Sequence, residues 1–181
     1  MSAPGASATP IVLRSTREDH LIAALAALAI AIHVAESALP MPLPGAKPGL
    51  ANVIVIVALL RYGWKTAAWV SMLRVLAGSI VIGTFLSPSF MLSLSGAVAA
   101  IAAVGLVWAI RPGALGPIGY SVIAAMAHMA AQFHVAWLLF IPHPALFGLL
   151  PILMTLALFF GLTSGIIVQA ALTRMKAGSV S

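Results

Sequence analysis

Six apolar segments make up most of this chain, and charged, glycine and proline residues stand between them. Only 7% of the residues are charged, against about 25% in a soluble domain. So few charges could not cover the surface of a chain of 181 residues in water. The sequence therefore predicts an all-α integral membrane protein, with helices over His20–Leu39, Leu50–Tyr62, Lys65–Phe85, Phe90–Ile110, Ile118–Ile141 and Leu146–Leu172.

The basic residues predict which way the chain crosses the membrane. Six transmembrane helices place both termini on one side, and seven basic residues then fall on that side against Lys47 alone on the other. By the positive-inside rule, the termini are cytoplasmic in a multi-pass protein of the bacterial cytoplasmic (inner) membrane. We expect residues 1–19 to be a disordered cytoplasmic tail, residues 20–173 the transmembrane domain and residues 174–181 a cytoplasmic tail.

Lys47 belongs to the run Pro44-Gly45-Ala46-Lys47-Pro48-Gly49-Leu50-Ala51-Asn52, which interrupts the apolar pattern. Two glycines and two prolines disfavour regular helix there, and the apolar segment that follows is short for a membrane span. Broken backbone at membrane depth is tolerated where it lines a cavity, so the run is a candidate binding element. An ordinary external loop explains the pattern equally well.

Arg74 falls near the middle of the third predicted helix, where lipid would penalise its charge. It must therefore face the protein interior and needs a partner. The chain has three acidic residues, and Glu36 is the one near the outer half of the membrane. Three interpretations stay open: an Arg–Glu pair that ties two helices together, hydrogen bonds to backbone carbonyls, or a site for an anionic ligand.

Two pairs of polar residues share helix faces. His33 and Glu36 are three residues apart, and His128 and Gln132 are four apart. Together with the residues above, they map to the outer half or middle of the membrane, which predicts a pocket reached from outside for a small anionic or aromatic molecule. The predicted ligand-binding residues are Glu36, Lys47, Asn52, Arg74, His128 and Gln132, with no catalytic residue and no metal site.

Several functions lack the residues that they require. The chain has no cysteine and no Walker A loop, so energised transport would need a partner. Three acids cannot form the carboxylate clusters that hold magnesium in a prenyl diphosphate synthase, so we expect the chain not to be an enzyme by itself. The basic residues stand singly between apolar runs, which excludes a nucleic-acid surface. Ser95-Gly96-Ala97-Val98 resembles a sequence that carries covalent flavin, but Val98 replaces the acceptor threonine.

Several short stretches resemble the Gx transporter family, also labelled heptaprenyl diphosphate synthase component I. The resemblance covers about residues 21–172. The sequence departs from the family pattern at Pro48, where leucine is usual, and at Met129 and Ala131, where asparagine and glycine are usual. The stretches that carry it are Glu36-Ser37, the Pro44–Asn52 run, Leu73-Arg74 and Ala127-His128 followed by Gln132.

The resemblance implies a six-helix bundle similar to the S-components of energy-coupling factor transporters. Such a protein binds a vitamin-like molecule, and a transmembrane coupler with ATPase subunits drives its uptake. A membrane redox subunit that binds flavin or quinone non-covalently is the first alternative. An accessory component of heptaprenyl diphosphate or quinone biosynthesis is the second.

Overall fold

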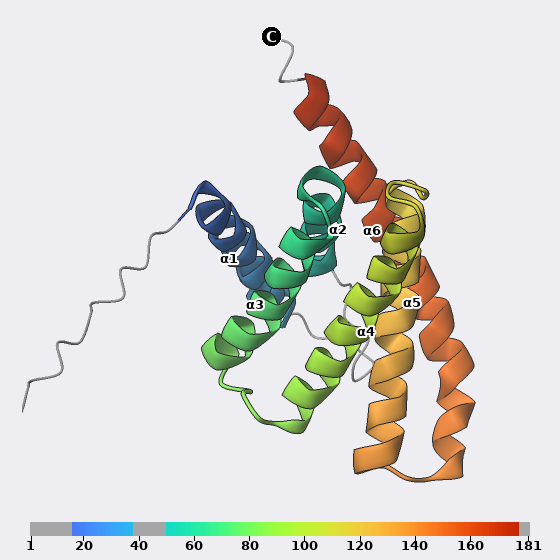
Figure 1. Ribbon diagram of the computed structural model, residues 1–181. Helices are drawn as coiled ribbons and strands as arrows, with labels where there is room; N and C mark the ends of the chain where they lie inside the picture. Colours follow the sequence, from blue (N-terminus) through green and yellow to red (C-terminus); the bar gives the residue numbers. More distant parts are fainter. Residues whose placement is uncertain (1–15, 38–49, 178–181) are drawn as a thin grey trace, which may run out of the picture.

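The computed structural model describes residues 16–37 and 50–177, and these residues form helices without any strand (Figure 1). The predicted all-α class is therefore confirmed. Lys47 and most of the predicted Pro44–Asn52 run lie outside the described residues, as do residues 1–15 and 178–181. The helices are α1 (Arg17–Ser37), α2 (Ala51–Tyr62), α3 (Trp64–Ile82), α4 (Pro88–Ile110), α5 (Pro117–Val135) and α6 (Leu150–Ala177).

Local sequence explains where α3 ends and α4 begins. Gly83 follows α3 with φ +76°, a left-handed conformation that glycine adopts without steric cost. Ser87 precedes α4, and its hydroxyl accepts a hydrogen bond from the Phe90 amide at 3.3 Å. Pro88 occupies the first position of α4, where its missing N–H removes no helical hydrogen bond. The predicted third helix to Phe85 is therefore three residues too long.

Five of the helical segments are long and apolar enough to cross a membrane, and α2 is the exception. Its 12 residues extend for about 18 Å, well short of a hydrocarbon core of about 30 Å. Most of α2 is buried, including Val55, Ile56 and Leu59. Helix α2 contacts α1, α3, α5 and α6, so it is the central helix of the bundle.

The α5–α6 pair departs from simple helices at its connection. The last turn of α5 continues as a π-helix over Ala136–Phe140, and a 3₁₀-helix over Pro144–Leu149 leads into α6. The two long helices approach closely along Gly161 and Gly165 of α6. A Cβ atom at Gly165 would lie 2.5 Å from the Ile118 Cα, so glycine is what permits this approach.

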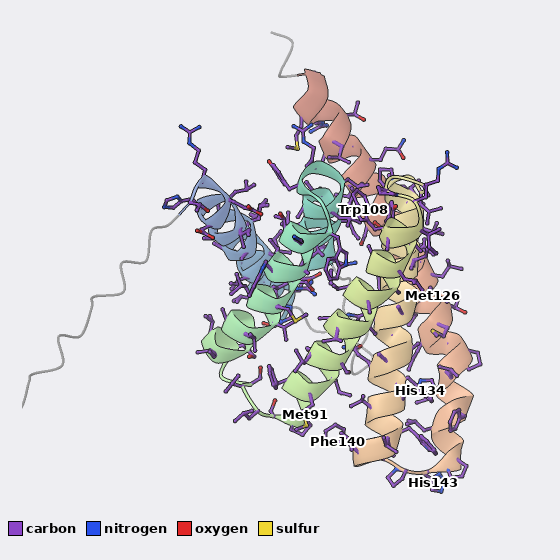
Figure 2. The ribbon with its side chains drawn as sticks, viewed as in Figure 1. Met91, Trp108, Met126, His134, Phe140 and His143 are labelled. Carbon is purple, nitrogen blue, oxygen red and sulfur yellow. The ribbon has the colours of Figure 1, made fainter. Side chains whose placement is uncertain are left out.

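The described chain begins and ends at one end of the bundle, because successive helices alternate in direction (Figure 1). We call this the basic end, since it carries five described basic residues at helix termini and turns. Figure 2 shows Trp108 near this end and Phe140 and His143 at the opposite end. Which end faces the cytoplasm stays a prediction from the positive-inside rule. The residues that define the basic end are Arg17, Arg61, Lys65, Arg111 and Arg174.

Candidate ligand-binding site

Arg74 is buried within the bundle, on the middle of α3. Its side chain is only 7% exposed, and its Nε atom has no hydrogen-bond partner among the residues that the structure describes. A buried donor without a partner costs free energy comparable to a lost hydrogen bond, and more when it carries charge. Arg74 is thus a positive group with an unused N–H donor in the interior.

His128 of α5 lies in a notch formed by Gly96 of α4. A Cβ atom at Gly96 would be only 2.6 Å from the His128 Nε2 atom, so any other residue would push the imidazole away. Arg74 and His33 lie near enough to the ring to interact with it electrostatically. The notch therefore fixes the position of the imidazole, within electrostatic range of the buried arginine.

His33 of α1 meets α3 in a similar way. Its Cδ2 atom would be 3.1 Å from a Cβ atom at Gly78, which lies one helical turn beyond Arg74. The imidazoles of His33 and His128 thus each pack against a glycine of a neighbouring helix, in the region of the same arginine. We call His33, Glu36, Arg74 and His128 the central polar cluster.

Glu36 connects the cluster to the start of α2. Its side chain is 4% exposed, and its Oε1 atom accepts a hydrogen bond from the backbone N–H of Leu50, the residue before α2. A carboxylate is favoured there because the first N–H groups of a helix lack internal partners and carry positive partial charge. Glu36 also interacts electrostatically with Arg74. Glu36 therefore both caps the start of α2 and partly balances the charge of the arginine.

Of the other predicted site residues, two lie in helices that contribute to or adjoin the cluster and one lies outside the described residues. Asn52 is half-buried in the first turn of α2, two residues beyond the amide that Glu36 binds. Gln132 is half-buried on α5, one turn beyond His128 on the same helix face. Lys47 lies outside the described residues, so its place in the site stays a prediction.

His134 and His143 lie away from the cluster, toward the end of the molecule opposite the basic end (Figure 2). Both are exposed. The His134 Nδ1 atom is 2.7 Å from the Ala130 carbonyl oxygen, and His143 Nδ1 accepts a hydrogen bond from the Ala145 amide at 3.1 Å. Both contacts are local, the first within α5 and the second in the α5–α6 connection.

A model of the family described as heptaprenyl diphosphate synthase component I matches residues 25–171 of the chain. The match covers most of the sequence and every predicted site residue. The chain belongs to this family. No curated protein and no solved structure gave a match. The family resemblance expected from the Glu36-Ser37, Leu73-Arg74 and Ala127-His128 stretches is therefore confirmed.

Sequence reasoning missed two residues that shape the site in this member of the component I family, Gly78 and Gly96. Both lie within helices, and a glycine within a helical pattern costs about 1 kcal/mol relative to alanine. A glycine inside a helix is usually kept for a packing reason. The two glycines were therefore the signal in the sequence that could have pointed to a close contact there. The sequence could not show that an imidazole from another helix fills each position.

Exchange of Glu36 tests its contact with the start of α2. Glu36→Ala leaves the Leu50 amide without its acceptor, so we expect the protein to lose about 1–3 kcal/mol of stability. Glu36→Gln keeps an oxygen acceptor and should lose clearly less. Thermal unfolding of the purified variants in mild detergent measures both effects. Equal stability of wild type and Glu36→Ala would show that the contact contributes nothing.

Proposed function

We propose that this protein binds a small anionic or aromatic, vitamin-like molecule from the outer side of the bacterial cytoplasmic membrane and serves its uptake, in the manner of an S-component. The observation that carries this proposal is the buried Arg74, whose Nε–H has no partner among the described residues. Charged groups within a membrane are costly, and function is the usual reason that they are kept.

The chemistry around Arg74 suits an anion. The guanidinium offers a planar edge of N–H donors that matches a carboxylate or phosphate. His128 interacts with it electrostatically and His33 lies against Gly78 one turn away, so both would supply imidazole nitrogens, and Glu36 would help to orient the arginine. Asn52, Gln132 and Lys47 would complete the site with amide hydrogen bonds and a second positive charge.

Uptake through this chain would require an energy source from other subunits, because the sequence has no Walker A loop. A transmembrane coupler and ATPase subunits are the partners that an S-component-like role implies. The long apolar helices leave wide surfaces for such contacts within the membrane.

The family description favours one second candidate, an accessory role in heptaprenyl diphosphate or quinone biosynthesis. Three acidic residues in the whole chain are too few for the paired magnesium sites of a synthase. In this role the chain would therefore assist a catalytic subunit that supplies those carboxylates.

Native mass spectrometry of the protein in gentle detergent, followed by organic extraction, distinguishes these functions. Under the uptake proposal, a stoichiometric small molecule co-purifies with the wild type and is lost from Arg74→Ala. A flavin or quinone mass would identify the ligand as a redox cofactor. A wild-type protein that carries a soluble aspartate-rich synthase and no small molecule would overturn the uptake proposal in favour of the accessory role.

A further inference from the structure

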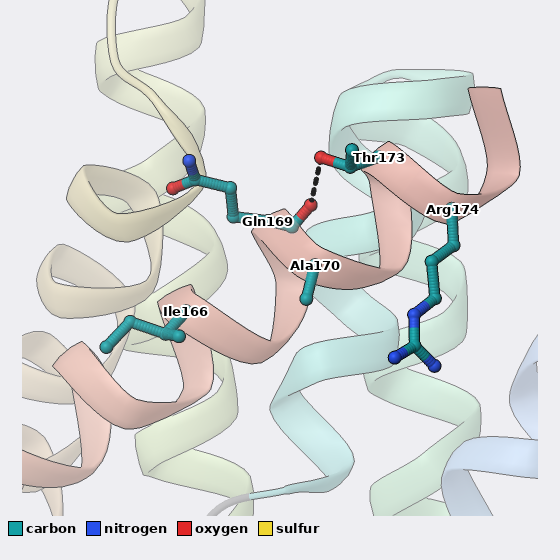
Figure 3. Close-up of a pocket in the computed structure, with 5 residues that line it drawn as sticks. All are labelled: Ile166, Gln169, Ala170, Thr173 and Arg174. Atoms are coloured by element: carbon teal, nitrogen blue, oxygen red, sulfur yellow. Dashed lines mark hydrogen bonds between the residues drawn. The ribbon is translucent and has the colours of Figure 1, made fainter. Parts of the chain in front are cut away.

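One face of α6 near the basic end forms a shallow depression that lies apart from the central polar cluster. Its lining residues recur at helical spacing, all are exposed, and the Ala170 side chain lies between those of Gln169 and Arg174 (Figure 3). The depression is apolar at one end and polar at the other. It is lined by Ile166, Gln169, Ala170, Thr173 and Arg174.

The length of α6 sets the membrane depth of this face. A hydrocarbon core of about 30 Å spans about 20 helical residues, so a core that begins near Leu150 ends near Ala170. Ile166 then faces acyl chains, and Arg174, about 12 Å further along the axis, lies at the level of the headgroups. The polar end of the depression therefore coincides with the phosphate layer.

The charge at this level has no counterpart on α6 itself. No acidic residue occurs in α6, and Arg174 is exposed. The two acids near the basic end, Glu18 and Asp19, lie on α1, where the Asp19 carboxylate already accepts hydrogen bonds from the Thr16 amide and hydroxyl. Thr173 donates its hydroxyl proton to the Gln169 carbonyl, at 2.9 Å, and so offers an acceptor only.

We propose that this face binds one anionic phospholipid, with its phosphate at Arg174 and one acyl chain along Ala170 and Ile166. Arginine pairs with phosphate through a fork of N–H donors. The Gln169 amide adds a donor on the other side of Ala170. A soluble anion would gain nothing from the apolar end, whereas a phospholipid matches both ends at the right separation.

Retention of lipid by the full-length protein tests this site. The protein is reconstituted in nanodiscs of equal parts phosphatidylglycerol and phosphatidylcholine, released in the mass spectrometer, and its bound lipids are counted. We expect wild type to retain phosphatidylglycerol selectively, and Arg174→Gln to retain about fivefold less, as expected for loss of one basic contact at a membrane surface.

Two variants complete the design. Arg111→Gln removes another exposed charge at the basic end, in the turn after α4, and should retain phosphatidylglycerol as wild type does. Ala170→Glu places a carboxylate inside the depression and should also abolish selective retention. Positions 170 and 174 are exposed, so Ala170→Glu and Arg174→Gln should have the same thermal stability as wild type. Equal retention by Arg174→Gln and Arg111→Gln, or equal retention of the two lipids, would overturn the proposal.

Discussion

Arg74→Ala should weaken binding of the small molecule that co-purifies with the wild type by about a hundredfold in affinity. The expected size follows from removing one or two charge-assisted hydrogen bonds, each worth about 1.5–3 kcal/mol. Insertion and folding should persist, because Glu36 keeps its hydrogen bond to the Leu50 amide when the arginine is absent. Titration of the extracted molecule against purified protein measures the affinity.

Arg74→Lys is the matched variant for this test. Lysine retains the positive charge but lacks the planar edge that includes Nε, so we expect binding to recover only in part. Full recovery would show that charge alone matters. If Arg74→Ala yields no folded protein and Arg74→Lys restores it, the arginine is instead a structural partner of Glu36, and the proposed binding role fails.

Gly165→Ala should destabilise the protein, although glycine to alanine within a helix normally stabilises by about 1 kcal/mol. The sign reverses because the new Cβ atom would lie 2.5 Å from the Ile118 Cα, a backbone atom that cannot rotate away. Helices α5 and α6 must then separate, and overpacking of this kind costs about 1–3 kcal/mol. Thermal unfolding in detergent measures the change.

Gly148→Ala is the control, since nothing lies within 4 Å of a Cβ atom at that position. We expect its stability to match or exceed that of wild type. Equal stability of the two variants would mean that the close approach of α5 and α6 along Gly165 and Ile118 is not maintained in the membrane.

The helices themselves could be predicted from the sequence, because runs of apolar residues and their glycine and proline breaks act locally. The predicted limits agree within a few residues for α2 and α4. The π-helix over Ala136–Phe140 and the 3₁₀-helix over Pro144–Leu149 could not be predicted. They arise where two long helices are joined through Pro142-His143-Pro144, and no periodic signal separates them from ordinary helix.

The candidate site was predictable only in its parts. Helical spacing places His33 beside Glu36 and His128 beside Gln132, since it decides which residues share a face. It does not decide which faces meet. The meeting of α1 with α3 and of α4 with α5 depends on Gly78 and Gly96, whose role becomes visible only when an imidazole from another helix occupies each notch.

The short, buried α2 also has a consequence for how the protein is made. Twelve residues are too few to cross a bilayer alone, and the single residue Gly63 joins α2 to α3. The two helices would therefore insert into the membrane together as one hairpin. In that hairpin α3 is the helix that is long and apolar enough to cross the bilayer. Because α5 and α6 also pack on α2, the core closes only after the last helix has been synthesised.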